Sequence, residues 1–162
     1  MFRNHGKSSL LAYEHTIPVV ATKHFVAREH IKSANIGHMG PNFKEHFLDR
    51  VEEDIPAVNL VVRRLSRSLT DDIIRGELAR LKENQNIFLA HFFQILKCQA
   101  DGQSGLLIAD KNIAYINYFW VIFAYWDLAN RKWDVYANSM PSRISIGWGV
   151  GNKVFSQGIK VY

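Results

Sequence analysis

The chain has 162 residues, of which 48% are hydrophobic and 22% are charged. This length and composition predict one globular domain over residues 1–162 and exclude an intrinsically disordered protein. The net charge of +5 permits an anionic partner, but the basic residues are spread along the chain, which excludes a basic docking tail.

The first third of the chain is predicted to be mostly helical. Residues 1–12 form an arm or a short strand, and a helix follows over residues 19–33. Glycine and proline then interrupt the chain, and two further helices are predicted over residues 43–54 and 56–66. Asn42 is a suitable N-cap, and Pro56 stands where its missing N–H costs little.

Residues 71–97 carry the clearest periodic pattern. Positions four and three apart form one stripe: Ile74, Leu78, Leu81, Gln85, Phe88, Phe92 and Ile95. Such spacing is typical of the apolar face of an amphipathic helix, so one long helix is predicted here. Gln85 is its only polar member and is interpreted as a buried residue that fixes the pairing register.

The last third of the chain is predicted to be β. Residues 106–109 and 113–126 form strands, the second apolar on both faces. A hairpin then joins Trp126 to Trp133 through a turn that contains Asn130, and residues 133–138 and 143–150 alternate as strands do. The predicted fold class is therefore α+β. Helices in a mainly helical segment 1–100 pack on a C-terminal antiparallel sheet of four to five strands in a mainly β segment 101–162.

Six histidines lie in the first 46 residues, and three of them follow a glutamate directly. Imidazole and carboxylate groups together bind zinc or iron. The spacings of metal-binding helices, such as His-x-x-x-His, are absent from the sequence. We therefore expect no metal site and no cofactor. A small enzyme that uses the N-terminal His/Glu cluster, possibly with a metal, stays open as an alternative.

Basic residues and glycines supply the candidate binding residues. Arginines are densest at positions 63, 64 and 67, and a glycine-rich segment at 147–153 is similar to a phosphate-binding loop but lacks the helix that should follow. Gly147 and Gly149 are better explained as a bare strip on a strand. The candidate binding residues are Arg63, Arg64, Arg67, Arg143, Gly147, Gly149 and Lys153.

No recognisable catalytic motif surrounds a nucleophile, and the single cysteine, Cys98, cannot form an intramolecular disulfide. The sequence thus favours a non-catalytic interaction or structural component of a larger assembly, which docks on a protein partner or on its own copy through a helix face or the sheet. A nucleic-acid-binding module is the other alternative, because nine aromatic residues lie between positions 115 and 136 near lysine and arginine. We expect no membrane span, no secretory signal, and a cytoplasmic or other reducing compartment.

Overall fold

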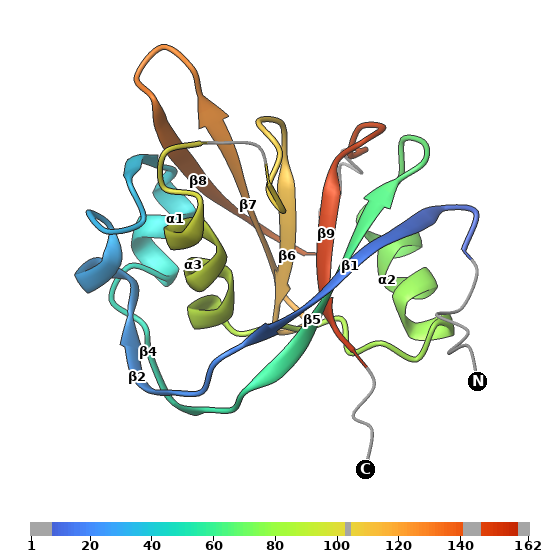
Figure 1. The fold of residues 1–162 in the computed structure, drawn as a ribbon, viewed down its shortest axis with the longest axis horizontal. Coiled ribbons are helices and arrows are strands. Elements are labelled where there is room, and N and C mark those ends of the chain that lie inside the picture. Colours follow the sequence, from blue (N-terminus) through green and yellow to red (C-terminus); the bar gives the residue numbers. More distant parts are fainter. Residues whose placement is uncertain (1–7, 103–104, 141–146, 159–162) are drawn as a thin grey trace.

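The computed structural model describes residues 8–102, 105–140 and 147–158. Its main sheet is mixed and has seven strands in the order β1-β5-β9-β6-β7-β8-β3 (Figure 1). In chain order these strands are β1 (Leu11–Val19), β3 (Ile36–Met39), β5 (Val58–Leu65), β6 (Asn112–Ile116), β7 (Trp120–Asp127), β8 (Lys132–Ser139) and β9 (Lys153–Gln157). The β6–β9 and β3–β8 pairs are parallel, and the other neighbours are antiparallel.

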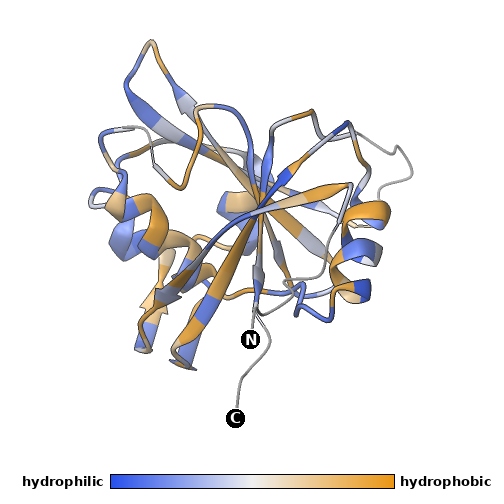
Figure 2. Cartoon of the chain, turned by 45° about the vertical axis from the view of Figure 1, so that its right-hand side comes forward, coloured by the Kyte–Doolittle hydropathy of each residue, from blue (hydrophilic) through white to orange (hydrophobic). Residues whose placement is uncertain are grey.

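Each face of the sheet has its own helix. Figure 2 shows α3 (Leu89–Cys98) on one side of the sheet and α2 (Asp71–Arg80) on the other. The α3 side also holds a 3₁₀ helix, η1 (Ala27–His30), the short helix α1 (Pro41–His46), and a two-stranded sheet of β2 (Thr22–Val26) and β4 (Val51–Ile55). Alternate residues of the central strands enter opposite cores, which explains why β6 is buried along its whole length.

The prediction of one long helix over residues 71–97 is wrong. The structure has α2 and α3 instead, separated by eight residues that include two isolated bridges to the main sheet. The apolar stripe is divided between two cores. Ile74 and Leu78 of α2 pack in the core on one face of the sheet, whereas Phe92 and Ile95 of α3 pack in the core on the opposite face. Gln85 fixes no helix pairing, because its side-chain oxygen accepts a hydrogen bond from Arg75 Nε.

The predicted division into a helical first part and a β second part is also wrong. Residues 19–33 form β2 and η1, residues 43–54 are shared by α1 and β4, and residues 56–66 contain β5. β5 is rich in valine and leucine and is buried on both faces, a pattern of central strands that periodicity alone does not separate from a buried helix. The sheet is therefore a seven-stranded mixed sheet that begins at residue 11, not a C-terminal antiparallel one of four to five strands.

The aromatic segment at 113–126 folds as two strands rather than one. It turns at Asn117, whose φ of 51° lies in the left-handed region that asparagine tolerates better than most residues. The hairpin prediction is confirmed, because Trp126 pairs with Trp133 across β7 and β8. Of the strand predicted at 143–150, residues 143–146 lie outside the described residues, and Trp148 forms an isolated bridge with Leu69. Within the described residues, no helix has the length and apolar character needed to cross a membrane.

Candidate functional site: an aromatic face of the sheet

Three aromatic rings lie side by side on the outer part of the sheet. They are on the same face as α2, which covers the strands nearer the centre of the sheet. Strand alternation places Phe123 and Tyr125 of β7 on the same face as Tyr136 of β8. The Tyr136 ring lies within 16° of parallel to Phe123, with centroids 5.3 Å apart, and within 8° of parallel to Tyr125, at 5.6 Å. Phe123 in turn meets the Trp148 ring edge-on at 5.1 Å. We call Phe123, Tyr125, Tyr136 and Trp148 the aromatic face.

Helix α2 leaves the outer part of this face uncovered. The core beneath α2 extends along β7 only to Val121 and the partly buried Phe123. Tyr125 and Tyr136 lie beyond that core, and both keep part of their surface in solvent. The aromatic face is therefore continuous with a packed core at one end and open at the other, which fixes the rings without hiding them.

A glycine makes room for the central ring. A Cβ built at Gly40, just after β3, would lie 2.6 Å from Tyr136 Cδ1, closer than real Cβ atoms approach. The Tyr136 ring therefore rests on bare backbone. This close approach requires glycine at position 40 and limits how far the ring can tilt.

Polar groups line the outer end of the aromatic face. The Tyr125 and Tyr136 hydroxyls are 3.1 Å apart, and this hydrogen bond, aided by burial, raises the pKa of Tyr125 to about 12. Asp134 is 7% exposed. Burial, followed by the charge of Asp127, raises the pKa of the Asp134 carboxyl, while the nearby His38 opposes the shift. The His38 ring lies 5.5 Å from that of Tyr136. Flat apolar surface thus adjoins two hydroxyl groups and an exposed imidazole, a combination suited to binding.

Two of the predicted binding residues are buried. Arg63 is 2% exposed, and its guanidinium donates to both oxygens of the Glu83 carboxylate. Lys153 lies on the opposite face of the sheet, where its ammonium is 2.9 Å from Glu14. Both cations are already neutralised inside the fold, so neither belongs to an open anion-binding surface.

The other predicted binding residues do not assemble either. Arg64 is exposed and lies 3.4 Å from Glu14, and Arg67 is exposed in the segment between β5 and α2. Gly147 lies against the Ser68 side chain, and Gly149 adjoins Asn152. The remaining predicted residue, Arg143, lies outside the described residues. Of the described ones, Gly147 and Gly149 flank Trp148 of the aromatic face in the chain, whereas no described cation among them lies over its rings.

The N-terminal histidines are dispersed over separate elements. His15 is on β1, His24 on β2, His30 on η1, His38 on β3 and His46 at the end of α1. His24 is 3.5 Å from Glu53, and His30 contacts Lys97. Burial, followed by the charge of Lys97, lowers the pKa of His30. Over residues 8–102, 105–140 and 147–158, no three His, Cys, Asp or Glu side chains are grouped so as to hold a metal ion.

Sequence reasoning noticed the aromatic residues but not the face they form. The signal that could have found it is the alternation in β8, where Asp134 and Tyr136 share the side opposite to Trp133 and Val135. Comparisons with protein-family models, with curated proteins and with solved structures gave no match.

Proposed function

We propose that this protein is a non-catalytic binding component of a larger assembly, and that it docks on a protein partner through the aromatic face. The observation that carries the proposal is the set of parallel rings of Phe123, Tyr136 and Tyr125, held at fixed spacing and left partly open to solvent. Tyrosine and tryptophan dominate the energetic centres of protein interfaces, because they bury a large area with few rotatable bonds.

The supporting argument is preorganisation. Tyr136 is wedged over Gly40, and its hydroxyl is paired with that of Tyr125, so little side-chain freedom is left to lose on binding. The exposed His38 and the hydroxyls of Tyr125 and Tyr136 supply the directional contacts that a hydrophobic patch alone lacks. Docking through one long helix over residues 71–97 is excluded, because this segment forms α2 and α3.

The test compares an aromatic-face variant with a control on the same hairpin. Tyr125→Asp places a charge among the rings, whereas Leu128→Asp changes an 80% exposed residue at the hairpin tip. The protein is isolated from its own cells with its bound proteins, and self-association is measured by analytical ultracentrifugation.

We expect Tyr125→Asp to raise the dissociation constant of the association seen with the wild type by at least about 30-fold. This is the effect of losing about 2 kcal/mol of binding free energy at an interface centre. Leu128→Asp should leave it within about twofold. Association that survives Tyr125→Asp, or that both variants weaken equally, would contradict the proposal.

A further inference from the structure

Arg75 on α2 is held rigidly between two tyrosines. Its guanidinium lies over the Tyr115 ring at 5.6 Å and over the Tyr118 ring at 5.5 Å. Nε donates to Gln85 Oε1 at 2.7 Å, and Nη1 donates to the Tyr118 carbonyl oxygen at 3.1 Å. Two rings and two hydrogen bonds thus fix both the plane and the position of this cation.

This fixed cation has no ionic partner in the described part of the chain. The buried arginine, Arg63, pairs with Glu83, and Arg80 on the same helix pairs with Glu77, but no described ion pair includes Arg75. The carboxylate one turn earlier, Asp71, accepts hydrogen bonds from the Tyr115 hydroxyl and the Trp148 indole instead. The positive charge of Arg75 is therefore held in place but not neutralised.

One end of the guanidinium remains available. Among the described residues Nη2 has no hydrogen-bond partner, and it is not one of the buried polar atoms left without one. Nη2 is therefore not sealed inside the fold, and no described residue satisfies its N–H groups. Guanidinium groups bind phosphate through such donors, and a preorganised guanidinium does so without first paying the entropy of ordering its side chain.

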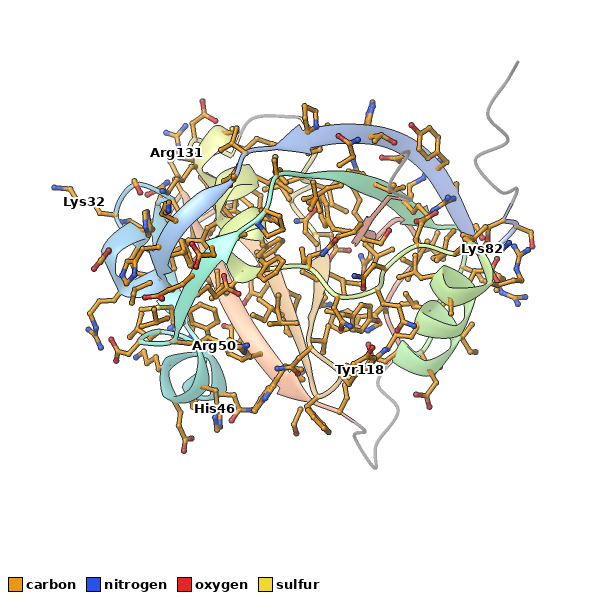
Figure 3. All side chains as sticks on the ribbon, turned by 90° about the horizontal axis from the view of Figure 1, so that it is seen from below. Lys32, His46, Arg50, Lys82, Tyr118 and Arg131 are labelled. Carbon is orange, nitrogen blue, oxygen red and sulfur yellow. The ribbon has the colours of Figure 1, made fainter. Side chains whose placement is uncertain are left out.

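The ring beside this cation is open on its outer side. Tyr118 is 67% exposed and Phe119 63% exposed, at the three-residue turn between β6 and β7. The turn is stiffened by Asn117, whose side-chain oxygen accepts a hydrogen bond from the Phe119 N–H. Figure 3 shows Tyr118 at the rim of the molecule, far from Arg131 at the end of the β7–β8 hairpin. The outer side of the Tyr118 ring is thus open to a stacked ring, next to the fixed cation.

From this arrangement we infer a binding site for a phosphate group joined to an aromatic base, with Arg75 as the phosphate anchor and Tyr118 as the stacking surface. The ligand is a nucleotide, either free or as one unit of a single strand. The site uses none of the residues of the aromatic face, so it stands or falls independently of the proposed docking function.

The test follows the side-chain Nε–H signal of Arg75 by NMR during titration with adenosine monophosphate, adenosine and ribose 5-phosphate. We expect the monophosphate to bind with a dissociation constant of about 1 mM or below. Adenosine lacks the charged hydrogen bonds and ribose 5-phosphate lacks the stacked ring, so each should bind at least about tenfold more weakly. Equal binding of adenosine and the monophosphate would overturn the inference.

Two variants and a control make the assignment specific. Arg75→Gln, followed through backbone amide signals, should weaken the monophosphate at least about tenfold. Tyr118→Ala changes a 67% exposed residue and should weaken the monophosphate similarly, even if Arg75→Gln fails to fold. Arg50→Gln removes another arginine that lies over a ring, that of Phe47, but whose guanidinium makes no described hydrogen bond. This control should change affinity less than twofold. An equal loss in Arg50→Gln, or no loss in Tyr118→Ala, would reduce the effect to general electrostatics and refute the site.

A short oligothymidylate distinguishes the two sources of the ligand. If the source is a single strand, the oligonucleotide binds more tightly than the mononucleotide and loses affinity steeply as salt rises. If the source is a free nucleotide, the oligonucleotide binds no more tightly per nucleotide. Either result supports the phosphate site, whereas binding of neither ligand refutes it.

Discussion

Replacing Glu83 by alanine should strongly lower the free energy of unfolding, because it would leave a buried guanidinium without its counter-charge. Arg63 is 2% exposed and Glu83 9% exposed. Arg63 Nε lies 3.0 Å from Glu83 Oε1, the Ser156 hydroxyl donates to the same oxygen at 2.7 Å, and Arg63 Nη1 donates to the Leu11 carbonyl. In Glu83→Ala only the Leu11 carbonyl would still accept from the guanidinium.

Breaking a buried ion pair by removing one partner costs about 3–5 kcal/mol. Whole domains of this size are typically stable by about 5–15 kcal/mol, so the loss is a large part of the total. With a urea dependence of about 2 kcal/mol per molar, the unfolding midpoint of Glu83→Ala should fall by about 2 M. Equilibrium urea unfolding followed by tryptophan fluorescence measures this shift.

The control replaces both charges at once. Arg63→Met with Glu83→Leu fills the same space without leaving a charge unpaired, so it should recover most of the lost stability. If Arg63 belonged to a surface patch, as its place among the arginines at 63, 64 and 67 suggests, Glu83→Ala would change stability by less than about 0.5 kcal/mol. That small effect, or a double variant as unstable as the single one, would refute the buried-pair argument.

Three further predictions follow from burial. Desolvation lowers the pKa of His91 below the unfolded value of about 6.5, so the unfolded chain takes up a proton first and the free energy of unfolding falls as the pH drops below about 6.5. Urea unfolding at pH 7.5 and 5.5 should show a smaller fall for His91→Gln than for the wild type. His30, whose pKa is also lowered, contributes to the fall in both proteins. Phe92→Ala should cost about 3–5 kcal/mol and Phe88→Ala less, because Phe92 is fully buried in the core beneath α3 and Phe88 is only partly buried against it; equal losses in thermal melts would be inconsistent with this difference in burial. Gly40→Ala should cost about 1–3 kcal/mol by pushing the Tyr136 ring away, and an unchanged near-ultraviolet circular dichroism spectrum would argue against the wedged ring.

The sequence predicted the C-terminal hairpin because its signals are local. Alternation across Trp133, Val135 and Ala137, with a turn around Asn130, specifies a hairpin without any knowledge of its neighbours. The strand β5 has no such local signature. Its middle residues, Leu60, Val61 and Val62, are apolar and buried on both faces because both sides of the sheet are covered, and that fact depends on segments far away in the chain.

The predicted binding residues and the two proposed binding surfaces also differ in how far local sequence could reveal them. Arginine density indicated Arg63, and the glycine-rich segment at 147–153 indicated Lys153. Whether each cation is buried and paired depends on Glu83 and Glu14, which come from distant segments. The aromatic face was partly foreseeable, since its rings alternate along β7 and β8. The pairing of Tyr115 and Tyr118 around Arg75 was not, because it requires α2 and the β6–β7 turn to meet.

The division of the stripe at 71–97 has a local cause that a single substitution can test by its sign. Helix α2 ends in a Schellman motif: Lys82 N–H donates to the Ala79 carbonyl and Glu83 N–H to that of Leu78, with Lys82 at φ 60°. Glycine is the usual residue at this position, and lysine there gave the sequence no signal of a helix end.

Lys82→Gly relieves the left-handed strain and should raise stability by up to about 1 kcal/mol, whereas in a continuous helix glycine would lower it by about 1 kcal/mol. Lys82→Ala is the control. It keeps the Cβ and removes only an exposed side chain, so its urea midpoint should stay close to that of the wild type and below that of Lys82→Gly. A lower midpoint for Lys82→Gly than for Lys82→Ala would mean that residue 82 is helical, and that the stripe from Ile74 to Ile95 belongs to one helix after all.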